Sequence, residues 1–191
     1  MTSHSFSTTR AQWKAPVVLD PNTAHPQLVL SEDLTCMRLA TEAMQLPDVP
    51  ERFDQYACAL ASKGFLSGKH YWDVEVGEVD TWFLGVMPSS AKRKGWFSIQ
   101  TEGLTLCRSD GEYRALSPSR PSVALAVGRD PRTIRVQLDW ARGTLSFSDP
   151  HHGDDTHLHT FTHTFTERVF PYFMHPALRI LPAEVAVTQV Q

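Results

Sequence analysis

Histidine and aspartate, two residue types that bind zinc, gather in one short stretch of the sequence. It holds His151, His152, Asp154, Asp155, His157, His159 and His163. On a strand, His157 and His159 would share one face. Nothing in the surrounding sequence indicates the groups that orient metal ligands, so the stretch favours a polar loop that gains charge below pH ~6.5. We therefore predict no metal and no cofactor.

The sequence lacks the patterns that place side chains for catalysis. It contains neither a Gly-x-Ser-x-Gly nucleophile elbow nor a phosphate-binding glycine run followed by a helix. Cys36, Cys58 and Cys107 are far apart, and apolar neighbours of the last two indicate buried, inert thiols. The sequence therefore predicts a domain that is not an enzyme. Reduced cysteines indicate a cytoplasmic location, with the nucleus as a second option.

The densest positive charge lies in a loop with an aromatic residue. Lys92, Arg93 and Lys94 are followed closely by Trp96. Such a group can bind a carboxylate or phosphate through charge-assisted bonds and stacking, although a solvated loop is the alternative. Without strand alternation, the loop is expected to tolerate substitution without exposing the core. It is too short for a nucleic-acid site, and the net charge of −3 also argues against that partner.

The elements that would position these residues are β-strands. Polar and apolar side chains alternate along residues 68–77, as in a half-buried strand. Trp72 and Trp140 are predicted to pack in the core. Trp82 opens the next strand beside a loop, so both a core position and a pocket wall stay open for it.

Strand patterns recur every 8–15 residues or so, which is typical of an all-β sandwich of two antiparallel sheets. Beyond 27–31 and 36–39, we predict strands near 57–60, 69–77, 81–87, 96–100, 103–108, 112–116, 122–127, 132–140, 143–148, 156–161, 169–174 and 184–190. No long window has a helical period. No run reaches the ~18 apolar residues of a membrane span, so membrane insertion is not expected.

Three short motifs carry a resemblance to a known family. They are Leu19-Asp20-Pro21, Trp72-Asp73-Val74 and Leu138-Asp139-Trp140. They resemble the Leu-Asp-Pro, Trp-Glu-Val and Leu-Asp-Tyr-Glu signatures of the PRY-SPRY domain. Asp20 and Asp139 are predicted to accept backbone bonds at turns. The chain departs from the family at Asp73, at Trp140-Ala141, and at Leu104, where many relatives carry a tryptophan that often lines the ligand pocket.

The resemblance implies a SPRY, concanavalin-like jelly roll with an N-terminal PRY subregion. Residues 1–15 would be a flexible or helical lead-in, 16–50 the PRY subregion and 51–191 the SPRY sandwich, with 16–191 one structural unit. The most similar group is that of tripartite-motif proteins of the fish nuclear factor 7 and zinc-binding protein A33 type; butyrophilins are related.

That group implies a protein-interaction module that selects a protein or peptide target for a RING-type E3 ubiquitin ligase in innate immunity. The parent would dimerise through a coiled coil that this chain lacks. The resemblance places ligand-binding candidates on rim loops at His70, Trp82, Lys92, Arg93, Lys94, Trp96, Arg108 and Tyr113. Two alternatives stay open. One is a butyrophilin-like phosphate sensor in which His70, Lys94 and Arg108 converge; the other is a carbohydrate-binding jelly roll with an exposed aromatic beside paired Asp or Asn.

Overall fold

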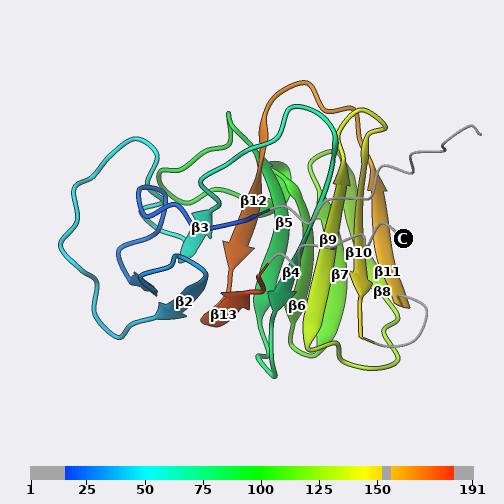
Figure 1. Cartoon of the computed structure of the whole chain (residues 1–191), viewed down its shortest axis with the longest axis horizontal. Helices are drawn as coiled ribbons and strands as arrows, with labels where there is room; N and C mark the ends of the chain where they lie inside the picture. Colours follow the sequence, from blue (N-terminus) through cyan, green and yellow to red (C-terminus); the bar gives the residue numbers. More distant parts are fainter. Residues whose placement is uncertain (1–15, 152–155, 183–191) are drawn as a thin grey trace, which may run out of the picture.

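Two antiparallel sheets pack face to face in the computed structural model, which describes residues 16–151 and 156–182 (Figure 1). The larger sheet contains, in spatial order, β1 (Leu28–Leu30), β2 (Cys36–Leu39), β13 (Ala177–Ile180), β4 (Lys69–Glu75), β9 (Thr133–Asp139), β10 (Thr144–Asp149) and β11 (Thr156–Thr162). The smaller contains β3 (Cys58–Leu60), β12 (Val169–Met174), β5 (Trp82–Pro88), β6 (Leu104–Ser109), β7 (Glu112–Ser117) and β8 (Arg120–Leu125). The predicted sandwich is confirmed.

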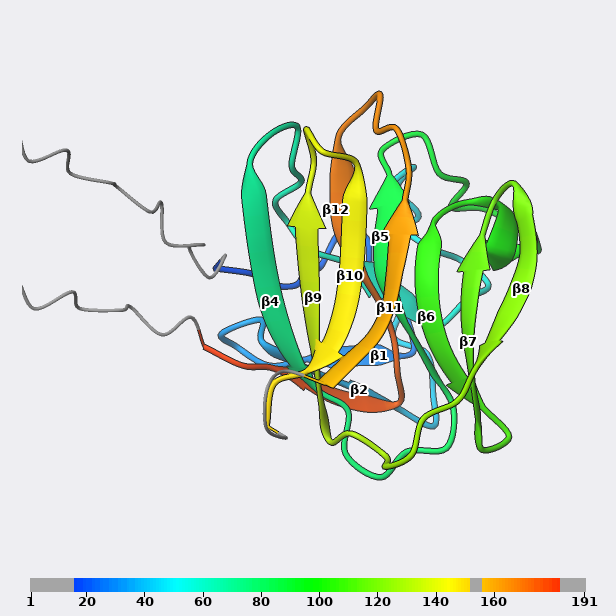
Figure 2. The ribbon, with the colours of Figure 1, turned by 90° about the vertical axis from the view of Figure 1, so that its right-hand side faces the viewer.

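The main core lies between the sheets, where alternation directs one face of each strand inward. Trp72 and Val74 of β4 and Leu84 and Val86 of β5 belong to one apolar cluster, and all four are almost fully buried. Figure 2 shows β4, β9, β10 and β11 side by side in front of the β12–β5 pair. Burial of Trp72 confirms its predicted core position. Trp140 is half-buried and packs against the same core.

A second apolar cluster covers the outer face of the six-stranded sheet. Phe53, Met87, Ile99 and Tyr172 form its centre, together with Cys58, Leu60 and Ala91. Met87 alternates with the inward-facing Val86, so the two residues belong to opposite faces of β5. The segment between β5 and β6 covers this cluster and includes the 3₁₀ helix η1 (Ile99–Thr101).

The N-terminal subregion joins the seven-stranded sheet through β2, which pairs with β13. Leu19 is fully buried and forms a bridge with Ala61. The connector from β2 to β3 runs out on the left of Figure 1 in light blue and cyan. Its Arg52 is buried and donates to the carbonyl oxygens of Pro47, Pro21 and Ala24, so this strandless connector is held to the subregion before it.

Both aspartates of the motif turns accept backbone bonds, as predicted. Asp20 Oδ1 accepts the Asn22 N–H at 2.9 Å, and Asp139 Oδ1 accepts the Arg142 N–H at 3.1 Å. The third motif aspartate, Asp73, is buried against Arg135 of β9, which donates from Nε and Nη2 at 2.9 and 3.1 Å. This bidentate pair satisfies the carboxylate that replaces the family's glutamate.

The structure corrects one predicted strand and adds one that was not predicted. Residues 96–100 are not a strand: the described chain there is loop and the start of η1. A strand at 177–180 was missed because Pro176 and the short Ala177–Ile180 run obscure its alternation. The predicted strand at 184–190 lies outside the described residues. No helix in the described part of the chain has the length and apolar character needed to cross a membrane.

Candidate functional site

The loop after β5 presents one aromatic side chain to solvent on a fixed base. Trp96 is 74% exposed, the highest value among the exposed large apolar residues of the described chain. Lys94 Nζ donates to Asp48 Oδ1, Val49 O and Arg52 O at 2.6, 2.8 and 2.7 Å. The loop is therefore fastened to the connector, which corrects the expectation that all of it tolerates substitution.

Arg93 adds a second attachment beneath the same loop. Its Nη1 donates to Glu51 O at 3.0 Å, and its guanidinium lies 5.2 Å from the ring centre of Phe53. Burial lowers the pKa of Arg93. Lys92 is exposed, and among the residues that the structure describes it is bonded only through its backbone N–H, to Glu102 Oε2 at 3.1 Å. Of the three predicted cations, Lys92 alone fits the solvated alternative.

Aromatic side chains support Trp96 from the side. Its ring meets Tyr56 edge-on with centres 5.2 Å apart, and Tyr56 meets Phe97 in the same way at 5.0 Å. The Tyr56 hydroxyl donates to the Phe97 carbonyl oxygen. Edge-to-face contacts of this kind fix ring orientation, so Trp96 stands in a defined position although most of its surface is in water.

Partly exposed apolar residues of the sheet continue this surface. Met174, Phe83, Cys107 and Arg114 face one another across four neighbouring strands. Met174 and Phe83 are half-buried and border the same outer cluster as the loop aromatics. We call the surface formed by Tyr56, Phe83, Trp96, Phe97 and Met174 the aromatic face.

The residues of the aromatic face are suited to binding. Burial raises the pKa of the Cys58 and Cys107 thiols, which keeps them protonated and weakly nucleophilic. Arg114 supplies a cation at its border and donates to Glu112 Oε2 at 3.1 Å. An exposed aromatic surface with an arginine at its edge has the composition of a protein-binding hot spot.

Three other candidates lie together at a different place. Trp82, Arg108 and Tyr113 are cross-strand neighbours on β5, β6 and β7. Trp82 is 1% exposed and also lines a cavity of about 500 Å³, so it is both a core residue and a pocket wall. We call this cavity the Arg108 pocket; its lining also includes Glu78, Asp80, Arg129, Asp130 and Arg132.

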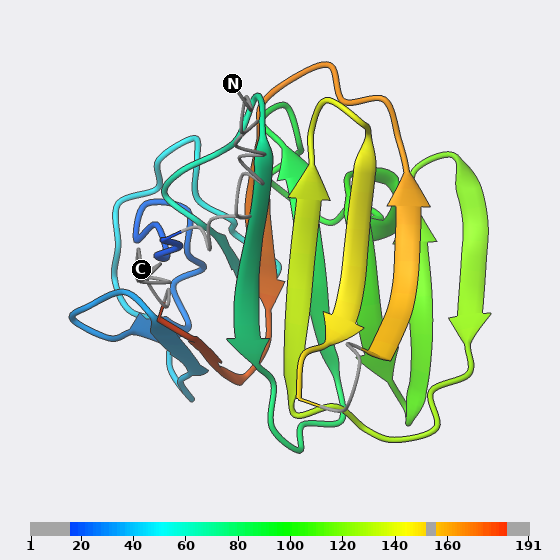
Figure 3. The same cartoon turned by 45° about the vertical axis from the view of Figure 1, so that its right-hand side comes forward.

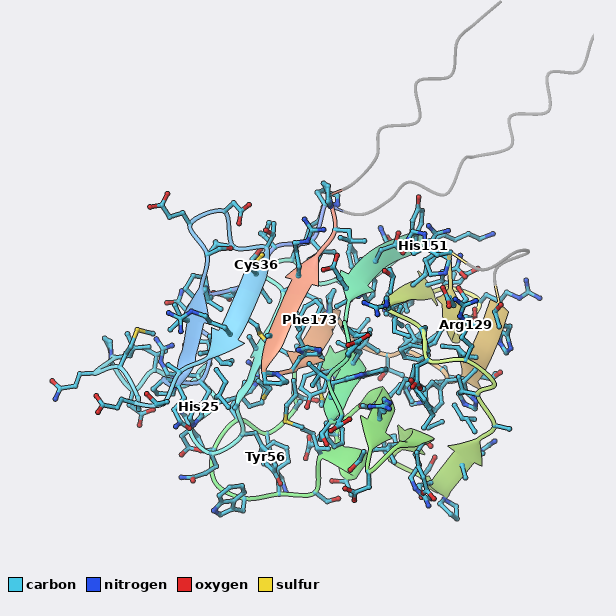
Figure 4. All side chains as sticks on the ribbon, turned by 90° about the horizontal axis from the view of Figure 1, so that it is seen from below. His25, Cys36, Tyr56, Arg129, His151 and Phe173 are labelled. Carbon is cyan, nitrogen blue, oxygen red and sulfur yellow. The ribbon has the colours of Figure 1, made fainter. Side chains whose placement is uncertain are left out.

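His70 belongs to neither surface. Its ring stacks on Phe65 with centres 3.9 Å apart, and its Nε2 lies 2.8 Å from Ser67 O. His70 lies near the start of β4 and Lys94 lies in the loop that follows the end of β5, on one rim of the sandwich, whereas Arg108 pairs with Trp82 at the start of β5, toward the other rim. In Figure 4, Tyr56 of the aromatic face and Arg129 of the Arg108 pocket are well apart. The eight predicted residues therefore do not form one site, and His70, Lys94 and Arg108 do not converge.

Two histidines of the 151–163 stretch, His157 and His159, contact residues of their own strand, β11. His157 Nε2 lies 2.7 Å from Thr160 Oγ1, and the rings of His159 and Phe161 are 4.5 Å apart. Over 16–151 and 156–182, no three His, Cys, Asp or Glu side chains lie close enough to hold a metal ion. His152, Asp154 and Asp155 are outside the described residues.

Sequence reasoning missed most of the aromatic face. Phe83 alternates with the inward-facing Trp82 and Leu84, so strand parity alone could have placed it on the outer face. Tyr56 and Phe97 carried no such signal, because both lie in irregular segments that tertiary contacts bring together.

Comparison with family models decides the class of the chain. Residues 17–65 match the SPRY-associated domain PRY, and residues 69–182, more than half of the chain, match the SPRY domain. The chain belongs to the SPRY family. As a PRY-SPRY domain it is a protein-interaction module of the kind found in tripartite-motif proteins.

Curated relatives place the PRY-SPRY domain within longer proteins. It is 41% identical over 84% of its length to Nuclear factor 7, ovary, of Xenopus laevis, and 41% identical over 82% to the erythroid membrane-associated protein of Mus musculus. It is also 41% identical over 82% of its length to the E3 ubiquitin-protein ligase TRIM69 of Mus musculus. The chain spans only 27%, 28% and 31% of these relatives.

A solved structure confirms the fold. The TRIM65 PSpry domain superimposes with a TM-score of 0.77 at 21% identity, covering 88% of this chain and 90% of that one. Low identity limits this likeness to the fold, which is the PRY-SPRY sandwich described above.

Proposed function

We propose that this PRY-SPRY domain captures a partner protein on its aromatic face. The observation that carries the proposal is Trp96, 74% exposed and held in place by Tyr56 while Lys94 and Arg93 fasten its loop. Exposing a large apolar side chain to water is unfavourable, and holding it rigid lowers the entropy lost on binding. Tryptophan in such a position is the residue type that most often dominates binding energy.

The finer proposal concerns the parent protein. We propose that the domain selects substrates for a tripartite-motif E3 ubiquitin ligase, dimeric through a coiled coil, that acts in innate immunity in the cytoplasm or nucleus. Its support is the similarity to Nuclear factor 7 and TRIM69. Cells expressing the full-length parent test it: a partner captured through Trp96 should lose ubiquitin chains when Trp96→Ala is introduced. Unchanged ubiquitination would contradict ligase targeting through this face.

The direct test compares capture by two exposed apolar positions. Wild-type domain, Trp96→Ala and Val123→Ala are immobilised and exposed to cell extract, and captured proteins are identified. Val123 is 48% exposed on β8 (Figure 3), the edge strand opposite β3 in the six-stranded sheet. We expect Trp96→Ala to weaken capture at least tenfold, or ~1.4 kcal/mol, with Val123→Ala unchanged. Equal capture by both variants would place recognition elsewhere.

The geometry favours neither of the two alternative functions, phosphate sensing and carbohydrate binding. The phosphate reading requires His70, Lys94 and Arg108 to converge, and Lys94 is already bonded to Asp48 and two carbonyl oxygens. The carbohydrate hypothesis requires an exposed aromatic residue with acidic side chains beside it, and these side chains must be able to accept hydrogen bonds from sugar hydroxyls. Asp54 beside Trp96 already accepts the Gly95 N–H at 2.8 Å. A glycan array that bound wild type and lost Trp96→Ala would nonetheless favour a sugar ligand over a protein.

A further inference from the structure

A partly buried arginine lies where β6 leaves the inter-sheet core, in the Arg108 pocket. Arg108 follows Leu104 and Leu106 at strand spacing on β6, and both leucines point into the main core. Its side chain is 15% exposed. Trp82 and Tyr113 flank it on the neighbouring strands, and the Tyr113 ring centre lies 5.7 Å from the guanidinium carbon. The guanidinium therefore lies over the Tyr113 ring, with Trp82 as its cross-strand neighbour on the other side.

The donors of this guanidinium are incompletely used. Nη1 donates to Val79 O at 3.0 Å and to Asp80 Oδ1 at 3.3 Å, and Nη2 donates to Asp130 Oδ2 at 3.4 Å. Nε is buried with no hydrogen-bond partner. The two carboxylate contacts are longer than the ~2.8 Å usual for charge-assisted bonds. A buried donor without an acceptor is unfavourable, so Arg108 can gain from a further acceptor.

The ion pairs of Arg108 with its two aspartates are weak, so a further acceptor can compete with them. Asp80 and Asp130 side chains are 89% and 68% exposed, so water screens both ion pairs. Asp130 also accepts the Tyr113 hydroxyl at 2.8 Å. Burial and this hydrogen bond raise the pKa of Tyr113, so its hydroxyl keeps the proton it donates. The Asp130 carboxylate is therefore shared between Tyr113 and Arg108.

The formal charges of the pocket balance, so a singly charged anion meets less net repulsion there than a dianion. Its lining has the cations Arg108, Arg129 and Arg132 and the anions Glu78, Asp80 and Asp130. Arg132 is bonded to Glu78, whereas Arg129 has no hydrogen-bond or ion-pair partner among the described residues. Any anion in the pocket faces the same three carboxylates, and their repulsion is about twice as large for a phosphate dianion as for a monoanionic carboxylate. Either anion can be bound by the under-used guanidinium of Arg108 and the unpaired one of Arg129. The planar carboxylate also matches the guanidinium edge in shape.

We propose that the Arg108 pocket binds a carboxylate of an acidic peptide segment, as a second site separate from the aromatic face. A cavity of about 500 Å³ holds a few residues of such a segment. Arg108 receives the carboxylate, Trp82 and Tyr113 form the wall, and Arg129 adds a second cation to the same site. The site is independent of the proposed capture by Trp96, so the two can fail separately.

The test uses the whole domain, isotopically labelled, and follows the Arg108 Nε–H and Trp82 indole N–H signals by NMR. N-acetylglutamate N-methylamide offers a side-chain carboxylate, N-acetylalanine offers a terminal one, and N-acetylglutamine N-methylamide is the neutral control. Inorganic phosphate tests the dianion. The probes are titrated through the ~1 mM range expected of a single small contact. We expect saturable shifts of both signals with a carboxylate probe and none with the glutamine probe.

Three results would overturn the proposal: no saturable shift with either carboxylate, equal shifts with the glutamine probe, or stronger binding of phosphate. Preference for one carboxylate probe identifies a side chain or a chain terminus as the source and supports the site. Arg129→Gln, at an exposed position, should weaken binding severalfold without unfolding the domain, and unchanged binding would contradict the role of Arg129. Trp96→Ala should leave these shifts unchanged.

Discussion

Replacing Lys94 by alanine tests whether this residue stabilises the loop in a way that its solvated neighbour Lys92 does not. The ammonium makes three bonds, to Asp48 Oδ1, Val49 O and Arg52 O, within 2.8 Å. Asp48 is 79% exposed, so this ion pair contributes only about 0–1 kcal/mol. The two carbonyl bonds use a charged donor, which can contribute about 1.5–3 kcal/mol each in buried settings.

Partial exposure of the lysine reduces that range. The Lys94 side chain is 38% exposed, and water can reach the carbonyl oxygens once the side chain is gone. We therefore expect Lys94→Ala to lower the free energy of unfolding by about 1–2 kcal/mol. Lys92→Ala is the matched control, because the Lys92 side chain is exposed and makes no hydrogen bond or ion pair in the described part of the chain. It should change stability by less than ~0.5 kcal/mol.

Urea unfolding of the wild type and the variants measures this difference through the midpoint at constant slope. Asp48→Ala separates the ion pair from the carbonyl bonds and should resemble the Lys92 control. If Lys94→Ala and Lys92→Ala have the same midpoint, the loop is not fastened by Lys94, and the preorganisation of Trp96 loses its main support.

Further predictions concern the sheets, the turns and pH. In Gly85→Ala the new Cβ would lie 1.9 Å from the Leu104 carbonyl oxygen, so the free energy of unfolding should fall by about 1–3 kcal/mol or more; Gly128→Ala, with open space around the new Cβ, should not change it. Asp139→Ala should lower the free energy of unfolding, measured in urea, by ~1 kcal/mol, because the Arg142 N–H loses its acceptor. An unchanged urea midpoint would refute the assignment of Asp139 to the turn. Burial lowers the pKa of His175 below 6.5, so the unfolded chain binds the proton first as pH falls below ~6.5 and stability declines there. His175→Gln should flatten that decline between about pH 7.5 and 5.5; an identical slope would show that His175 does not contribute.

Local sequence determined the fold class and the motif turns. Alternation in Lys69–Glu75 and Thr133–Asp139 placed two central strands, because side chains of a strand must alternate between core and solvent whatever the neighbours are. Asp20 and Asp139 could be assigned to turns because each bonds a backbone group two or three residues away. Such contacts depend on short-range geometry that the sequence itself contains.

Tertiary structure decided which candidate residues meet. The sequence offered Lys94 as a ligand contact, but its acceptors at Asp48, Val49 and Arg52 are more than 40 residues away and come within reach only when the connector packs on the loop. Strand order likewise brought Arg108 beside Trp82 and Tyr113 and away from Lys94. Chain alternation gives the face that a side chain occupies, whereas the pairing of distant strands gives its neighbours, and charge and solvent exposure at a site follow from those neighbours.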